Sequence, residues 1–251
     1  MRDVILQKLH EIEAKHEVKI LLAVESGSRA WGFASPDSDY DVRFVYMHNA
    51  AHYISIETKR DVIELPVNEV LDIGGWDIKK ALWLFRKTNA TLYEWLQSPI
   101  IYMADESFHQ QMLDMMEEYY LLRPAFHHYI SMTLNTYNGD LQGEEVRMKK
   151  YFYALRPILA AKWIIDRQSV PPMEFSKLRV LVEDSSINTA IDELLEAKKT
   201  ADEKTTMPPN AVLHSLIKDT IDYCNANKDK LSERDSDTEK LNELFRQMIG
   251  V

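Results

Sequence analysis

The sequence ESGSRAWGFASPDSDYDVR, from Glu25 to Arg43, decides the fold of this chain. It follows the short apolar run 19–24, which predicts a buried strand that ends in a turn at Gly27. From Tyr40 to Tyr46 apolar and charged residues alternate, and this pattern predicts a second strand with one polar face. The stretch therefore indicates two strands that are connected through a glycine turn.

The turn and the second strand carry residues suited to phosphate and metal chemistry. Gly27 lacks a Cβ, so its backbone N–H can approach a phosphate, and Ser28 adds a hydroxyl at the possible start of a helix, whose N-terminus favours an anion. Eleven residues after Ser28, Asp39 and Asp41 stand two apart, which places both carboxylates on one face of a strand. Their mutual repulsion is relieved by a divalent cation, and Mg²⁺ prefers oxygen ligands. The pattern predicts a metal–nucleotide site for phosphoryl or nucleotidyl transfer.

The order Gly-Ser followed by Asp-x-Asp resembles the signature of the DNA polymerase β nucleotidyltransferase superfamily. Over residues 27–43 the sequence is similar, more narrowly, to the RNA repair pathway DNA polymerase β family, the RlaP-type predicted nucleotidyltransferases. Other similar stretches are Leu71–Leu82, Glu94–Ile100 and Arg147–Trp163. The resemblance spans residues 20–175, and the sequence after Pro172 carries no motif of this kind.

The resemblance implies a set of ligands and catalytic acids. It implies two Mg²⁺ ions, or Mn²⁺ in their place, and an NTP substrate, with ATP among the candidates. Asp39 and Asp41 would be metal ligands and catalytic residues, and Gly27 and Ser28 would bind the triphosphate. A third acid on a neighbouring strand would complete the metal site and help to deprotonate the attacking hydroxyl. Asp72 is the preferred third acid, and the alternatives are Glu64 and Glu69.

Four cations are further nucleotide-binding candidates. Arg29 either binds a phosphate or pairs with Asp37. Arg43 shares the strand face of the two aspartates and either contacts the nucleotide or neutralises that pair. Lys149 and Lys150 belong to a basic, tyrosine-containing helix, which either lines a groove for triphosphate or polynucleotide or is an ordinary amphipathic helix with a charged face.

Several other residues that could have a functional role are interpreted as structural. Asp77 is expected to cap the helix that runs to Lys87. Trp31 and Phe33 are interpreted as core residues rather than as base-stacking residues. Adjacent histidines on a helix point in different directions, so His127 and His128 are not expected to bind a metal.

The sequence pattern differs between the first and the second part of the chain. Residues 1–104 mix helical and strand-like patterns, with further strand candidates at 61–65 and 67–73, the second ended by Gly74-Gly75. Residues 105–251 are helical in period nearly throughout. We therefore expect an α+β, polymerase β-like nucleotidyltransferase domain with a small mixed sheet over 1–104, followed by an all-α helical domain over 105–251.

Composition sets wider limits. A content of 45% hydrophobic and 28% charged residues is typical of a globular chain. The formal net charge of −10 excludes a broadly basic nucleic-acid coat protein, although a local basic groove is compatible with it. The single Cys224 excludes an internal disulfide, and no signal peptide or membrane span is visible, so a cytoplasmic location without a membrane partner is expected. The oligomeric state is left open.

These patterns lead to one principal hypothesis and its alternatives. The chain is expected to be an enzyme, a magnesium-dependent nucleotidyltransferase that moves an NMP from an NTP to a hydroxyl, with an RNA end in RNA repair as the acceptor that the family name suggests. Transfer to a protein or a small molecule is the enzymatic alternative. A non-catalytic module that binds a nucleotide or a partner is the alternative from another class.

Overall fold

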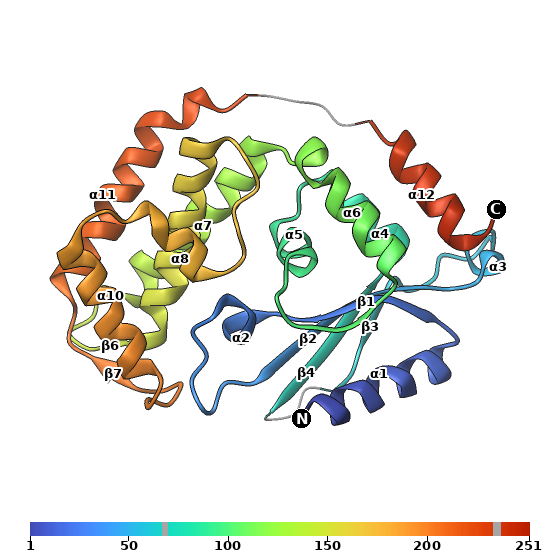
Figure 1. Ribbon diagram of the computed structural model, residues 1–251, viewed down its shortest axis with the longest axis horizontal. Helices are drawn as coiled ribbons and strands as arrows, with labels where there is room; N and C mark the ends of the chain where they lie inside the picture. Colours follow the sequence, from blue (N-terminus) through green and yellow to red (C-terminus); the bar gives the residue numbers. More distant parts are fainter. Residues whose placement is uncertain (67–69, 233–236) are drawn as a thin grey trace. The chain divides into compact units, whose positions relative to one another are not determined.

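The computed structural model describes residues 1–66, 70–232 and 237–251, and these form two compact units that are each discontinuous in sequence (Figure 1). The first unit contains Met1–Gly27, Asp39–Tyr119 and the C-terminal helix α12 (Glu239–Ile249). The second contains Ser28–Ser38 and residues 120–232. Helix α6 (Glu106–Tyr119) and α12 lie with the first unit, so the contacts divide the chain after Tyr119, whereas the expected boundary follows residue 104.

A five-stranded mixed sheet forms the centre of the first unit (Figure 1). Its strands are β1 (Lys19–Glu25), β2 (Tyr40–Met47), β3 (Val62–Glu64), β4 (Leu71–Asp77) and β5 (Ile101–Ala104), in the spatial order β3-β4-β2-β1-β5. Strands β2 and β4 run parallel, and the other neighbours are antiparallel. The sheet confirms the expected mixed α/β class.

Helices cover both faces of this sheet. Helix α1 (Arg2–His16) lies on one face, and α4 (Ile78–Arg86), α5 (Ala90–Leu96) and α6 lie on the other (Figure 1). The buried side chains of α1 pack in one cluster with Val42, Phe44 and Tyr46 of β2. Because side chains alternate along a strand, Asp41 and Arg43 point to the opposite face from this cluster.

The expectation that Gly74-Gly75 ends a strand is wrong, because β4 continues through both glycines to Asp77. The reason is packing. A Cβ built on Gly75 would lie 2.3 Å from the nearest ring atom of Phe44, its cross-strand partner in β2. Because Gly75 has no Cβ, it leaves the space that the Phe44 ring fills in the core, and it does not break the strand.

Asp77 caps α4, as expected, and its side chain accepts a hydrogen bond from the Lys79 backbone N–H. The helix consequently begins at Ile78, directly after the end of β4. Asn89 caps α5 in the same way by accepting from the Leu92 N–H. A short helix, α3 (Ala50–Tyr53), follows β2 and contacts α12 through an edge-to-face pair of Tyr53 and Phe245.

The second unit is mainly helical. Helices α7 (Leu122–Asp140) and α8 (Met148–Arg167) pack on each other, and α11 (Ala211–Asn227) packs on α8. The remaining elements are α9 (Phe175–Leu178), η1 (Arg179–Leu181), α10 (Ser185–Lys198), η2 (Lys228–Lys230) and the two-residue strands β6 (Val146–Arg147) and β7 (Thr206–Met207). Cys224 is buried in α11. In the described part of the chain, no helix has the length and apolar character that crossing a membrane requires.

We predict that Gly75→Ala lowers the free energy of unfolding by about 1–3 kcal/mol, because the new methyl group displaces the Phe44 ring from a tightly packed core. Urea unfolding followed by circular dichroism measures this. Gly139→Ala is the matched control, since a Cβ at Gly139 meets nothing within 4 Å. Equal losses in the two variants would contradict the packing explanation.

Candidate active site

The Asp41 carboxylate lies against the backbone of Gly27. Gly27 has a φ of +60°, and a Cβ built on it would be 2.1 Å from Asp41 Oδ2. The Ser26 N–H also donates to the Asp41 carbonyl oxygen at 2.8 Å, which ties the bend to the start of β2. The short helix α2 (Gly27–Trp31) begins at this bend. The structure thus brings together the glycine bend and one acid of the Asp-x-Asp pair.

Two residues that the sequence analysis did not single out support this arrangement. Glu25, at the end of β1, has 0% of its surface exposed, and its Oε1 accepts the Asp41 backbone N–H at 2.8 Å. The Tyr102 hydroxyl donates to Glu25 Oε2 at 2.5 Å, and burial, together with this negative partner, raises the pKa of Tyr102. The signal in the sequence was a charged residue at the end of an apolar strand, which predicts a buried charge with a specific role.

Asp72 is the cross-strand neighbour of Asp41, because β2 and β4 pair with these residues in register. The Arg43 guanidinium lies between their carboxylates, with Nη2 2.6 Å from Asp72 Oδ2 and 3.4 Å from Asp41 Oδ1. Of the two interpretations of Arg43, neutralisation of acids therefore matches its contacts, with Asp72 as the closer partner. Asp72 lies at the start of β4, not at the end of a strand as its position before Gly74 had indicated.

The remaining acids lie as follows. Asp39 directly precedes β2 and is exposed. Glu64 belongs to β3, pairs in register with Gly74 and forms an exposed ion pair with Arg60 at 2.8 Å. Glu69 falls outside the described residues.

Ser28, Arg29, Lys149 and Lys150 belong to the second unit. Arg29 Nη2 donates to the Ser38 carbonyl oxygen at 2.5 Å. Lys149 and Lys150 form ion pairs with Glu203 and Asp140 at 2.9 and 3.0 Å. The charged groups of both lysines therefore already have acidic partners inside this unit.

The aromatic residues of the motif belong to the packing of the second unit. Phe33 is 4% exposed and stacks on Phe152 with ring centroids 4.7 Å apart, which confirms the expectation for a core residue. Trp31 is covered by the Arg156 guanidinium, whose carbon lies 4.6 Å from the ring centroid. Arg156 is itself 2% exposed and donates to the Met173 carbonyl oxygen, so it is a packing residue of the basic helix.

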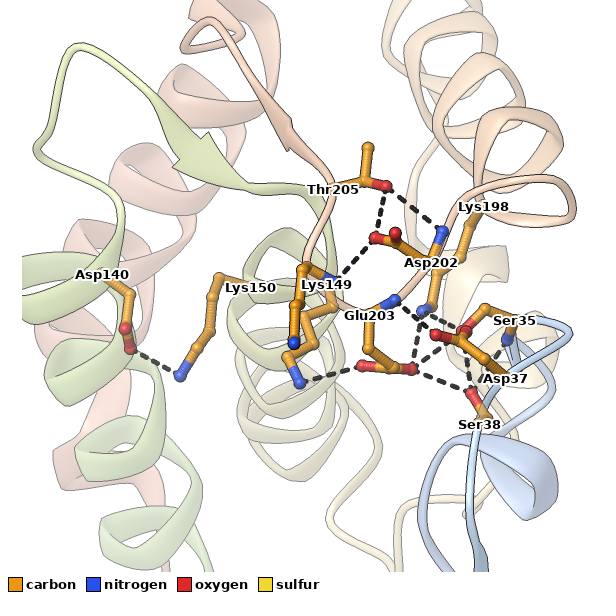
Figure 2. A network of polar contacts seen from close by, with 11 residues as sticks. Ser35, Asp37, Ser38, Asp140, Lys149, Lys150, Lys198, Asp202, Glu203 and Thr205 are labelled. Atoms are coloured by element: carbon orange, nitrogen blue, oxygen red, sulfur yellow. Dashed lines mark hydrogen bonds and ion pairs between the residues drawn. The ribbon is translucent and has the colours of Figure 1, made fainter. Parts of the chain in front are cut away.

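A polar network in the second unit fixes residues 35–38, which lie between the glycine bend and the Asp-x-Asp pair in the sequence (Figure 2). Glu203 Oε1 accepts hydrogen bonds from the Ser35 and Ser38 hydroxyls at 2.8 and 2.9 Å. The ammonium of Lys198, which is 3% exposed, lies 3.3 Å from both Ser35 Oγ and Glu203 Oε1. The Glu203 backbone N–H donates to Asp37 Oδ2 at 3.0 Å. The two serines of the motif are thus anchored by residues from the part of the chain that carries no recognisable motif.

The charge of Glu203 is stabilised by this network. Burial opposes its ionisation, but hydrogen bonds from Lys149, Ser35 and Ser38 outweigh burial and lower the pKa of the carboxyl to about 2. Nothing in the local sequence around Lys198 or Glu203 indicated this contact, because their partners lie more than a hundred residues away.

Comparison with known proteins identifies the class of protein to which this fold and site belong. A model of the RNA repair pathway DNA polymerase beta family matches residues 1–247, and the chain belongs to this family. The "Uncharacterized protein YcgL" of Bacillus subtilis (strain 168) is 42% identical over 251 residues, which cover 99% of this chain and 96% of that protein.

Among solved structures, a nucleotidyltransferase-like protein from Exiguobacterium sibiricum 255-15 aligns with 97% of this chain and 79% of its own. The identity is 11% and the TM-score 0.35, so the family assignment rests on the family model and the Bacillus relative. Membership of this family confirms the resemblance noted in the sequence and supports a transferase of nucleotidyl groups.

We predict that Glu203→Gln lowers the free energy of unfolding at pH 7 by about 1–3 kcal/mol, because it leaves the buried Lys198 ammonium without a charged partner. The difference from the unchanged protein should shrink as the pH falls from 4.5 towards 2. The reason is that a carboxyl with a lowered pKa stabilises the fold only while it is ionised. Urea unfolding at pH 7 and pH 3 measures both effects.

Glu196→Gln serves as the control, since Glu196 and Lys199 form an ion pair whose side chains are 74% and 67% exposed. An exposed pair of this kind contributes about 0–1 kcal/mol. A loss in Glu203→Gln no larger than in the control would show that the network does not stabilise the unit.

Proposed function

We propose that this protein is a magnesium-dependent nucleotidyltransferase that transfers an NMP from an NTP to a hydroxyl acceptor. One observation carries the proposal: the Asp41 carboxylate is held at the Gly27 bend and stands beside Asp72 of the neighbouring parallel strand. A nucleotidyltransferase needs acids next to a backbone that a triphosphate can approach. Family membership supports the same class of reaction.

The donor types suit Mg²⁺, although among the described residues Asp39, Asp41 and Asp72 do not lie close enough together to form a ready-made group of three metal ligands. Asp39, Asp41 and Asp72 offer carboxylate oxygens, the hard ligands that Mg²⁺ prefers. A positive charge, the Arg43 guanidinium, already lies between Asp41 and Asp72 and stands in for a cation at that point. Bound metal would supply charge neutralisation of the triphosphate and of the leaving pyrophosphate. Binding then requires Arg43 to release the two acids, and its guanidinium becomes available to the substrate phosphates.

The remaining roles belong to this chain's own residues. The backbone at Gly27 binds the triphosphate beside Asp41. Ser28, Arg29, Lys149 and Lys150, which belong to the second unit, stay predictions for nucleotide binding. The acceptor oxygen attacks the α-phosphorus, the bond from that phosphorus to the bridging oxygen breaks, and pyrophosphate leaves. Asp72 accepts the proton of the acceptor hydroxyl. Positioning and charge account for most of the catalysis, because phosphoryl transfer requires little covalent chemistry from the protein.

The acceptor we propose is an RNA end, on the strength of the family's description. Transfer to a protein or to a small molecule would need the same acids and the same bend, so the site chemistry alone does not distinguish these acceptors. Labelled NTP offered to pooled RNA, protein and small-molecule hydroxyls in parallel separates them.

We predict that Asp41→Asn and Asp72→Asn each reduce transfer by at least about 10³-fold, because several kcal/mol of transition-state stabilisation are lost with a metal-binding carboxylate. The measurement is incorporation of α-labelled NTP into RNA in the presence of Mg²⁺. Glu64→Gln is the matched control, since this acid lies on the next strand and pairs with Arg60 in solvent. If the unchanged protein shows neither transfer nor Mg²⁺-dependent nucleotide binding, the proposal fails.

We also predict that Gly27→Ala weakens Mg²⁺–NTP binding about tenfold or more, because its methyl group must displace the Asp41 carboxylate. Gly32→Ala isolates backbone strain from this steric conflict. Gly32 also has a positive φ, +90°, but a Cβ there meets nothing within 4 Å. Gly32→Ala should lose about 1 kcal/mol of stability from backbone strain, and Gly27→Ala should lose more because of the added steric conflict, while only Gly27→Ala should lose nucleotide affinity in calorimetric titration. Equal affinities in the two variants would contradict the role assigned to Gly27.

A further inference from the structure

A second group of candidate ligands lies at the other end of the same two parallel strands. His48 directly follows β2, His52 belongs to α3, and Asp77 ends β4. One nitrogen of each histidine and one carboxylate oxygen of Asp77 lie within 4.8 Å of one another, and among the described residues this is the one group of three or more such side chains close enough to hold a metal ion. Seven residues of extended chain, about 23 Å, separate His48 from Asp41.

The two imidazoles lie next to each other. Their rings are stacked, with centroids 3.6 Å apart and an angle of 6° between planes. Burial and the neighbouring His52 ring lower the pKa of His48 to about 4, and burial also lowers the pKa of His52. Imidazole binds metals in its neutral form. In this stacked arrangement the nitrogen lone pairs, which lie in the ring planes, do not converge on one point, so binding of a common ion requires the rings to turn out of the stack.

Asp77 is held firmly in place. It is 4% exposed, its Oδ1 accepts from the Lys79 N–H, and its Oδ2 accepts from the Tyr53 hydroxyl at 2.9 Å. The same Tyr53 oxygen accepts the backbone N–H of His48 at 2.9 Å, so one hydroxyl connects two of the three candidate ligands. Each carboxylate oxygen keeps a further lone pair for a cation. Burial raises the pKa of Asp77, and a bound cation would offset the cost of keeping this carboxylate charged.

The group opens on one side. His52, Tyr53 and Asp77 line a cavity of about 560 Å³ in the first unit, together with Lys79 and Lys80. An ion held by three protein ligands here would keep a coordination position directed towards the cavity. Such an open position is typical of zinc sites that bind water or a substrate group.

We propose that His48, His52 and Asp77 form a binding site for a divalent transition-metal ion, with Zn²⁺ as the preferred ion. Two imidazoles and one carboxylate suit Zn²⁺, whereas Mg²⁺ prefers oxygen ligands alone. The Tyr53 hydroxyl, which hydrogen-bonds the ligating carboxylate, orients it in the way that outer hydrogen bonds orient metal ligands. This site is distinct from the acids of the proposed active site.

The test is calorimetric titration of the full chain with Zn²⁺ alone, after removal of metals with a chelator. We expect about one Zn²⁺ per chain, undisturbed by a large excess of Mg²⁺. His52→Gln and His48→Gln should each weaken Zn²⁺ binding at least about 100-fold. Co²⁺ added in place of Zn²⁺ gives a second readout, since the intensity of its visible absorption rises when it leaves octahedral hydration for a protein site of lower coordination number, and this rise should be lost in the same variants.

Two controls isolate the site. His127→Gln/His128→Gln removes an exposed histidine pair and should leave Zn²⁺ affinity unchanged. Asp39→Ala/Asp41→Ala removes two acids of the proposed active site and should also leave the Zn²⁺ affinity unchanged. The zinc titration therefore tests the metal site independently of the nucleotidyl transfer assay. Circular dichroism verifies that each variant is folded. If folded His52→Gln binds Zn²⁺ as tightly as the unchanged chain, or if the unchanged chain binds none, the proposal is overturned.

Discussion

The approach of the Asp41 carboxylate to the backbone of Gly27 is the contact on which the candidate active site depends. It exists because residue 27 has no Cβ and because the end of β1 and the start of β2 are hydrogen-bonded through Ser26 and Glu25. Any other residue at position 27 would compete with Asp41 for the same space. The glycine therefore serves two purposes at once: it lets the chain adopt a positive φ, and it leaves room for an acid next to an approachable backbone.

The parallel pairing of β2 with β4 brings candidate ligand residues together at both ends of these strands. At the start of the strands it places Asp41 beside Asp72, and Arg43 balances their charge. At the far end the same register places Asp77 opposite Tyr46, two residues before His48. In a parallel pair the two strands begin on the same side of the sheet and end on the same side, so residues distant in sequence come together at the beginning and at the end of the pair. We infer that these two ends have different ligand chemistry, oxygen donors at the beginning and imidazole with carboxylate at the end.

The helical second unit contributes to the motif in a way that its own sequence does not suggest. Ser35 and Ser38 lie between the glycine bend and the Asp-x-Asp pair, yet their hydroxyls bind Glu203. A buried lysine, Lys198, completes the network, and a buried charge is tolerated only when it is paired. The conformation of the segment that joins the two halves of the motif is thus controlled by residues far along the chain.

Local patterns in the sequence predicted the first two strands, the helical period of most of the chain after residue 105, a glycine bend before the Asp-x-Asp pair, and the cap that Asp77 provides to a helix. These features depend on periodicity, turn chemistry and capping, which act over a few residues. The tertiary structure alone decided that Asp72, rather than Glu64, stands beside Asp41, that β4 runs on through Gly74 and Gly75, and that Glu203 holds the serines of the motif. Each of these depends on strand register or on packing between distant segments, and no local pattern encodes the partner that a side chain will meet.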